Sequence, residues 1–168
     1  NPFFSDVLRG ISASCHKHDY SINITTGDSE DAIYRDVIKM VQGKRVDGVI
    51  VLYSKEDDQV VPYLRERNFP FVMIGKPTAD ANDIVYVDND NVQASKEVAE
   101  FLINLGHEKI GYIGGDTHFE VTTARLAGFQ QAVVAYGIDI PNRFYKNIQL
   151  SSGDAKKVVG ELLGVDEP

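Results

Sequence analysis

The stretch from residue 84 to residue 133 limits most strongly what this chain can fold into. It opens with a short apolar run that stops at the polar residues 88–90, as a strand followed by a loop would. Apolar side chains then recur at the spacing of one helix face, at Ala94, Val98, Phe101, Leu102 and Leu105. Gly106 suits the left-handed cap of that helix, and a second apolar run covers 110–113. The stretch predicts a strand, a helix and a second strand in succession.

Strand and helix patterns alternate along the rest of the chain as well. Helices are expected near residues 5–15, 27–43, 60–64, 122–137 and 155–163, and strands over 20–25, 46–52, 69–74 and 144–150. Helix-length connections between strands predict an α/β fold with a doubly wound parallel sheet. Such sheets bind ligands at the carboxyl ends of their strands, where Asp88 and Asp116 stand in this sequence.

The composition excludes several classes of protein. The chain has 168 residues, of which 43% are hydrophobic, so it can bury a sizeable core. A net charge of −8 argues against a DNA-binding surface in these residues, because phosphate binding requires clustered Lys and Arg. No apolar segment is long enough to span a bilayer, and a single cysteine excludes an internal disulfide. We expect a soluble, cytoplasmic protein.

The sequence indicates neither a metal site nor an enzyme. Of the neighbours Cys15, His16 and His18, only Cys15 and His18 would share a helix face, so we expect a buried thiol and two exposed histidines. The loop over 88–90 resembles the start of a calcium site, but Ala99 stands where the required glutamate would be. Phosphate-loop, dinucleotide-binding and nucleophile-elbow motifs are absent. No cofactor is expected.

Several segments, taken in order, resemble the effector-binding region of the lactose and galactose repressor (LacI/GalR) family. They are NPFF at the start, SDVLRGI, KRVDGVIVL, VDNDN, LINLGHEKIGYIGGD and TARLAGFQQAV, and they extend over nearly the whole chain. The related periplasmic sugar-binding proteins share the R-x-x-GF element. The resemblance implies a periplasmic-binding-protein-like α/β fold with two doubly wound parallel-sheet lobes.

The resemblance also implies where the lobes lie. Residues 1–118 would form the first lobe without its first strand, with its sheet ending near residues 114–116. Residues 119–168 would begin a second lobe that is incomplete. We therefore expect the chain to be part of a longer protein.

The family's binding residues fall on six positions here: Phe3, Phe4, Asp88, Phe119, Val121 and Arg125. Asp88 would point into the cleft, or it could be a turn residue; Asn89 and Asp90 suit a turn and a helix cap. Arg125 would grip the effector from the second lobe, since its fork of donors suits adjacent hydroxyls. Either Phe3 or Phe4 would stack on the ligand while the other packs inward.

The implied function is that of a bacterial transcriptional repressor controlled by a sugar. The NPFF start and Phe119 resemble maltose-operon repressors, which makes maltose the expected effector. The other implied partners are operator DNA, bound by a helix-turn-helix outside these residues, a second copy in a homodimer, and a phosphoprotein corepressor. Dimerisation would use the first helix, around residues 5–14, and the second lobe. The alternatives are a periplasmic-type sugar-binding protein of a transport system and an α/β enzyme without a visible motif.

Overall fold

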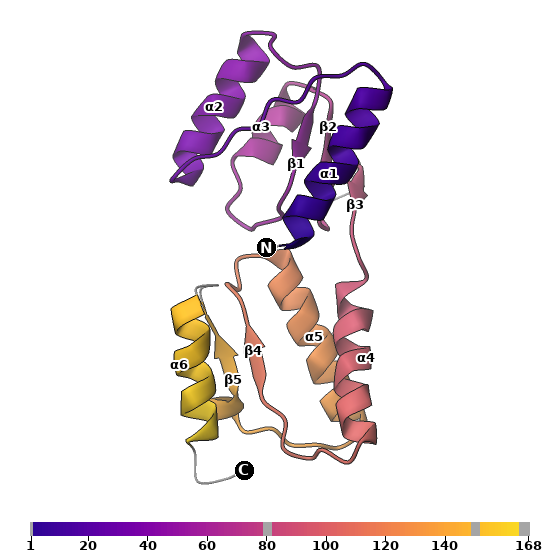
Figure 1. Ribbon diagram of the computed structural model, residues 1–168, viewed down its shortest axis with the longest axis vertical. Helices are drawn as coiled ribbons and strands as arrows, with labels where there is room; N and C mark the ends of the chain where they lie inside the picture. Colours follow the sequence, from indigo (N-terminus) through magenta and orange to yellow (C-terminus); the bar gives the residue numbers. More distant parts are fainter. Residues whose placement is uncertain (1, 79–81, 149–151, 165–168) are drawn as a thin grey trace. The chain divides into compact units, whose positions relative to one another are not determined.

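Six α-helices and five strands form the part of the computed structural model that is described, residues 2–78, 82–148 and 152–164 (Figure 1). The chain divides into two compact units, Asn1–Gly48 and Val49–Pro168.

The first unit contains two helices that the sequence predicts. α1 covers Pro2–Lys17 and α2 covers Glu30–Gln42. Ser29 begins α2 because its Oγ accepts a hydrogen bond from the backbone N–H of Ala32, one of the donors without an intrahelical partner. Val37 on α2 is 3% exposed, so this helix buries one side as a helix of a globular fold does. Both helix predictions are confirmed.

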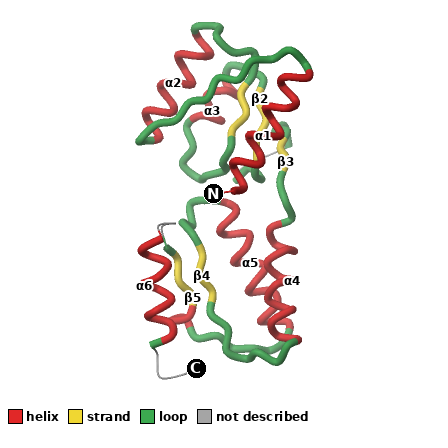
Figure 2. Tube along the Cα trace, viewed as in Figure 1, coloured by secondary structure: helices red, strands yellow, loops and turns green. Residues whose placement is uncertain are grey.

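The segment 20–25 is a loop in the structure, not the predicted strand (Figure 2). Tyr20, Ile22 and Ile24 alternate in sequence as they would in a strand, but all three side chains are exposed. A strand needs a partner strand for its backbone hydrogen bonds. Within the described residues no strand pairs with this segment, so the prediction is wrong.

Three parallel strands form the first sheet, in the order β1-β2-β3. They are β1 (Val49–Val51), β2 (Phe71–Ile74) and β3 (Tyr86–Val87). Helix α3 (Val60–Glu66) connects β1 to β2, and its Leu64 is fully buried. Parallel neighbours require such a crossover connection. The predicted strand-helix-strand order is confirmed here.

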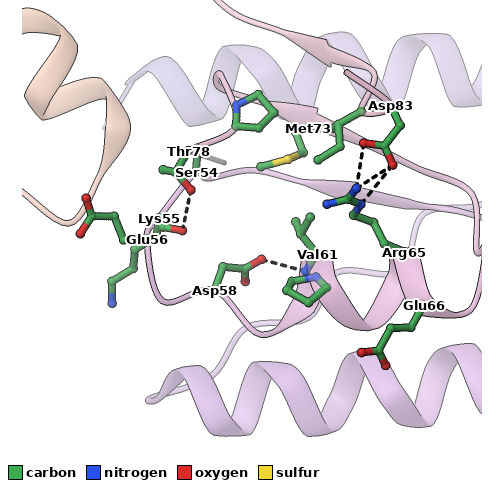
Figure 3. Close-up of a pocket in the computed structure, with 13 residues that line it drawn as sticks. Ser54, Lys55, Glu56, Asp58, Val61, Arg65, Glu66, Met73, Thr78 and Asp83 are labelled. Carbon is green, nitrogen blue, oxygen red and sulfur yellow. Dashed lines mark hydrogen bonds and ion pairs between the residues drawn. The ribbon is translucent and has the colours of Figure 1, made fainter. Parts of the chain in front are cut away.

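Asp58 caps the N-terminus of α3 (Figure 3). Its carboxylate accepts a hydrogen bond from the backbone N–H of Val60 at 3.1 Å. It accepts a second one, drawn in the figure, from the backbone N–H of Val61 at 2.8 Å. We expect Asp58→Ala to lower the free energy of unfolding of the intact protein by about 1–2 kcal/mol, the usual effect of losing a cap. Urea unfolding measures this change. The neighbouring exposed Asp57 provides the control, and an equal loss in Asp57→Ala would contradict the capping role.

The later part of the second unit forms a second, two-stranded parallel sheet, β4 with β5. Its elements are α4 (Asn91–Asn104), β4 (Tyr112–Gly114), α5 (Glu120–Ala135), a 3-10 helix (Asn142–Phe144), β5 (Tyr145–Asn147) and α6 (Ser152–Leu163). Asp90 begins α4, as predicted, because its carboxylate accepts from the N–H of Gln93 at 2.9 Å. Gly106 follows α4 with a φ angle of 91°, which confirms the predicted cap, and Gly137 ends the helix predicted over 122–137 in the same way, with a φ angle of 67°. Of the strand predicted over 144–150, residues 149 and 150 lie outside the described residues.

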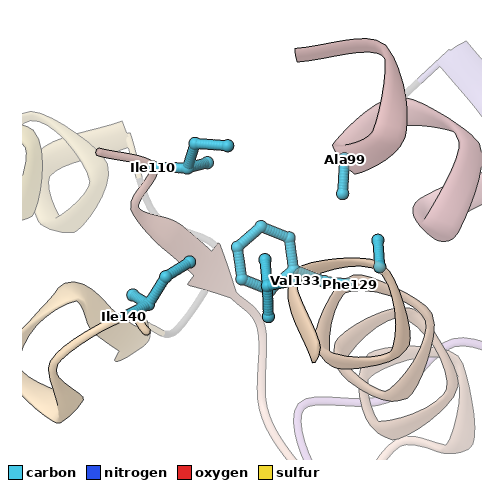
Figure 4. Close-up of a cluster of buried hydrophobic side chains, with 6 residues drawn as sticks. Ala99, Ile110, Phe129, Val133 and Ile140 are labelled. Carbon is cyan, nitrogen blue, oxygen red and sulfur yellow. The ribbon is translucent and has the colours of Figure 1, made fainter. Parts of the chain in front are cut away.

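Aromatic packing explains which sheet β4 joins. The ring centroid of Phe129 on α5 lies 5.1 Å from that of Tyr112 on β4 and 5.9 Å from that of Tyr145 on β5. Phe129 also belongs to a buried core whose other members are Ala99, Ile110, Ala132, Val133 and Ile140 (Figure 4). The resemblance placed residues 110–113 in the sheet of the first lobe. That expectation is corrected, because β4 pairs with β5 and not with β1–β3. The division into lobes at residues 118 and 119 stays a prediction.

The buried face of α4 also differs from the predicted one. Ala99 is 1% exposed and Leu102 packs against the core, but the other predicted inward residues, Ala94, Val98, Phe101 and Leu105, are exposed. Gly128 of α5 lies directly against the backbone of α4 at Val92 and Lys96. The face of α4 that α5 covers is therefore set by this close approach of the two helices. It is not the face with the most apolar residues.

Candidate functional site

Three hydrogen bonds hold Asp88 just before α4. Its Oδ1 accepts from the backbone N–H of Asn89 at 2.8 Å and from the side-chain amide of Asn91 at 3.1 Å. Its Oδ2 accepts from the backbone N–H of Lys76 at 3.1 Å. An ionised carboxylate has about four acceptor positions, so one remains for a ligand. Asp88 therefore organises the loop, as the turn alternative expected, and its contact with a ligand stays a prediction.

Arg125 belongs to the same hydrogen-bond network. Its Nε–H donates to Oδ1 of Asn91 at 3.0 Å. Asn91 is the first residue of α4 and is 6% exposed, whereas Arg125 lies in the second turn of α5 and is exposed. The structure thus brings Asp88 and Arg125 together through one side chain. Within the described residues, the two terminal nitrogens of the guanidinium form no hydrogen bond, so they are available to a ligand.

Glu120 adds a second carboxylate at the start of α5. Burial and the negative charge of Asp88 raise the pKa of Glu120, and the ammonium of Lys76 opposes that rise. These electrostatic effects require the three charged groups to lie near one another. Together with Arg125 they make two positive and two negative groups when all are ionised. The cluster is therefore close to electrically neutral.

Phe119 and Val121 lie on either side of Glu120, and both are half-buried. The ammonium of Lys55 lies 5.8 Å from the ring centroid of Phe119, a cation–π contact. The backbone N–H of Glu120 donates to the carbonyl of Ser54 at 3.2 Å, which ties this turn to the loop after β1. Val121 shares a helix face with Arg125, four residues later. The predicted ligand contacts of Phe119 and Val121 stay predictions.

Phe3 and Phe4 belong to the first unit. They are 44% and 39% exposed, and their rings meet edge to face with 5.3 Å between centroids. Neither is buried, so the expectation that one of them packs inward is wrong. An exposed aromatic face suits stacking on a sugar ring, and that role stays a prediction for both residues.

Sequence reasoning missed Lys76, Asn91 and Glu120. One signal could have indicated Asn91, which follows Asp88 by three residues at a helix start, where side chains reach back to the preceding loop. No local signal indicates Lys76 or Glu120. Lys76 contributes a backbone N–H from a distant loop. The pKa of Glu120 is raised by burial and by the charge of Asp88, both of which depend on the tertiary structure.

Asp116 and His118 form a separate pair in the loop before α5. Oδ1 of Asp116 lies 2.8 Å from Nδ1 of His118 and accepts from the backbone N–H of His118 at 2.9 Å. The side-chain hydrogen bond and the negative charge of Asp116 raise the pKa of His118 above its ordinary value of 6.5. The pKa of the Asp116 carboxyl is lowered below 3.8, first by the hydrogen bond from the backbone N–H of His118 and second by the hydrogen bond with the His118 ring.

We expect NMR titration of the intact protein to give His118 a pKa above 6.5, and Asp116→Asn to lower it. A raised pKa means that protonated His118 stabilises the fold fully below pH 6.5, and the effect is lost as the pH rises through the folded-state pKa. The lowered pKa of Asp116 gives the opposite pH dependence. Ionised Asp116 stabilises the fold above pH 3.8, and this stabilisation is lost as the pH falls through the folded-state pKa. An identical His118 midpoint in the variant would disprove the pairing.

A pocket of about 500 Å³ lies beside α3 (Figure 3). Within it, Arg65 forms hydrogen bonds of 2.9–3.1 Å with both carboxylate oxygens of Asp83, and Asp58 caps α3. None of the six residues predicted for ligand binding lines this pocket. It is therefore distinct from the cluster around Asp88.

Residues 2–78, 82–148 and 152–164 contain no group of three or more His, Cys, Asp or Glu side chains that could hold a metal ion. Cys15 is half-buried, and His16 and His18 are exposed. None of the described helices has the length and apolar character needed to cross a membrane.

The parallel sheets and the polar cluster that follows β3 are those of a ligand-binding α/β protein. Residues 1–163 match the family described as periplasmic binding proteins and sugar binding domain of LacI family. The chain therefore belongs to this family. The match confirms the resemblance seen in the sequence and the periplasmic-binding-protein-like fold.

Its relatives are transcriptional regulators. The HTH-type transcriptional regulator MalR of Streptococcus pneumoniae is 43% identical over 142 residues, which are 84% of this chain and 43% of the relative. A solved structure described as a transcriptional regulator LacI, from Bacillus cereus subsp. cytotoxis, has a TM-score of 0.95 at 45% identity and covers 100% of this chain and 60% of its own. The complex of the regulator CelR with cellobiose has a TM-score of 0.88 at 25% identity and covers 97% of this chain and 50% of its own. That these relatives are regulators agrees with the prediction that this protein is not an enzyme. The chain spans less than half the length of the curated relative.

Proposed function

We propose that this chain is the effector-binding and dimerisation region of a DNA-binding transcriptional repressor whose effector is a sugar. The observation that carries the proposal is the hydrogen-bonded connection of Asp88 to Arg125 through Asn91, in a chain of this family. Sugar binding closes the two lobes and alters operator binding by a helix-turn-helix outside these residues. Because the two equilibria are linked, sugar and operator change each other's affinity by the same factor.

An uncharged, polyhydroxylated ligand fits the electrostatics of the cluster. Arg125 offers hydrogen-bond donors, and Asp88 keeps one acceptor position. Hydroxyl groups both donate and accept, so neighbouring hydroxyls of a sugar can satisfy both residues at once. A ligand with a net charge would disturb the balance of two positive and two negative groups.

Maltose is the sugar that we propose. A solved structure from Staphylococcus that is described as a probable maltose operon transcriptional repressor is 31% identical, with a TM-score of 0.87, and covers 96% of this chain and 57% of its own. The regulator CelR was solved with cellobiose, which supports a sugar ligand of this general size. Phe3 and Phe4 or Phe119 would cover the apolar face of the sugar rings.

The remaining parts of the proposal concern assembly. A homodimer forms through α1 and the second lobe. A phosphoprotein corepressor is a further partner. A protein that acts on operator DNA works in the cytoplasm.

Calorimetric titration of the intact protein with maltose, cellobiose and glucose tests the proposal, together with anisotropy measurements on labelled operator DNA. We expect maltose to bind and to change the affinity for DNA. The absence of any sugar binding would refute the proposal. Sugar binding by a protein that never binds DNA would instead support the transport alternative.

A further inference from the structure

Within the part of the chain that the structure describes, Asn91 is the one residue whose side chain forms hydrogen bonds with both Asp88 and Arg125. Its amide nitrogen donates to Oδ1 of Asp88 at 3.1 Å, and its amide oxygen accepts from Nε of Arg125 at 3.0 Å. We propose that Asn91 is a positioning residue, which sets the orientation of the Arg125 guanidinium for the effector. The inference rests on the proposed function, because it assigns Asn91 a role at the same site.

The chemistry of the two neighbours fixes which way the amide faces. A carboxylate only accepts hydrogen bonds and a guanidinium only donates them. An amide is the side-chain group of this size that can donate to the first and accept from the second. The nitrogen of Asn91 also lies 3.2 Å from the carbonyl oxygen of Asn89, which reinforces the same orientation.

Asn91 is itself held firmly. It is 6% exposed, and it is the first residue of α4, whose start is fixed by the cap from Asp90. Arg125 is exposed, and among the described residues it has no other hydrogen-bond partner. The flexible arginine therefore takes its orientation from the buried asparagine. With Nε occupied, the two terminal nitrogens remain as donors to the ligand.

Two substitutions separate the two halves of this role. Asn91→Ala removes both hydrogen bonds and leaves Arg125 free to adopt other rotamers. Asn91→Asp keeps an acceptor for Arg125 but places a second negative charge beside Asp88. When the introduced carboxyl is protonated, its O–H can donate a hydrogen bond to Asp88 and its other oxygen can accept one from Arg125, as the amide of Asn91 does.

The experiment measures maltose affinity of the intact protein by calorimetry across a range of pH. We expect Asn91→Ala to weaken binding about tenfold or more at every pH, because it removes a charge-assisted hydrogen bond. We expect Asn91→Asp to weaken binding at neutral pH and to approach wild-type affinity as the pH falls. Asn104→Ala, at the exposed end of the same helix, is the matched control and should bind like the wild type.

The outcomes distinguish the inference from the proposed function. Unchanged affinity in Asn91→Ala, or no recovery of Asn91→Asp at low pH relative to the wild type, would overturn the positioning role. If the wild type binds no sugar, the proposed function fails, and exchange of the Arg125 Nε proton still tests Asn91 by NMR. Slow exchange in the wild type and fast exchange in Asn91→Ala would support the inference, and equal exchange would refute it. Thermal unfolding of each variant confirms that the proteins compared are folded.

Discussion

Arg125→Ala is expected to weaken sugar binding by the intact protein by about 10- to 100-fold, because hydrogen bonds to charged groups contribute about 1.5–3 kcal/mol. The guanidinium is held by Asn91 with its terminal nitrogens free of partners among the described residues, so its loss removes donors that only a ligand would use. Arg125→Lys should lose nearly as much, since an ammonium keeps the charge but not the planar fork. Calorimetry with maltose measures both variants.

Arg35→Ala serves as the control for charge and helix position. Arg35 is an exposed arginine on α2, in the other unit, and its loss should leave sugar affinity unchanged. Wild-type affinity in Arg125→Ala would exclude Arg125 from the site. A loss of binding in both variants would show that net charge, and not a specific contact, governs affinity.

Gly128→Ala is expected to destabilise the protein by about 1–3 kcal/mol or more, the range seen when a packed interior must accept an extra group. A methyl group at this position would overlap the carbonyl oxygen of Val92 and lie 3.1 Å from the backbone nitrogen of Lys96. Both atoms belong to the backbone of α4 and cannot move aside as a side chain could. Thermal unfolding should show a fall in Tm of roughly 2–12 °C for a chain of this size, at about 2–4 °C per kcal/mol.

Gly160→Ala tests whether the effect is specific to the contact between α4 and α5. Gly160 lies within α6, and a Cβ there would meet no atom within 4 Å. Alanine favours a helix over glycine by about 1 kcal/mol, so this variant should be as stable as the wild type or more stable. Equal stability of Gly128→Ala and Gly160→Ala would contradict the close approach of the two helices.

Sugar affinity should fall in Gly128→Ala as well. The contact of Gly128 with α4 keeps the first residues of α4 beside the first turns of α5, where Asn91 meets Arg125. The same glycine belongs to the R-x-x-GF element in which Arg125 stands. In this element, Arg125 is proposed to bind the ligand, and Gly128, three residues later, allows α4 to come close enough for Asn91 to contact Arg125.

Only some residues of the candidate site could be predicted from local sequence patterns. Asp88 and Arg125 could be selected from the sequence by resemblance, and the structure connects them. Asn91, which connects them, could not be selected in the same way. In the sequence it is an ordinary residue at a helix start, and only the packing of α5 against α4 brings it into contact with Arg125. Nothing in the sequence distinguishes Glu120 either, because the burial that raises its pKa and the charges of Asp88 and Lys76 that act on it come from the fold.

The sequence by itself determined the α/β class, the alternation of strands and helices in a parallel arrangement, the caps at Asp90 and Gly106, and the family. These features depend on the periodicity of apolar residues and on the conformations that single residues prefer. Only the tertiary structure decided that β4 joins β5, which face of α4 is buried, and that one asparagine connects Asp88 to Arg125. Each of these depends on contacts between segments far apart in the chain, and no local pattern encodes the distance at which two helices meet.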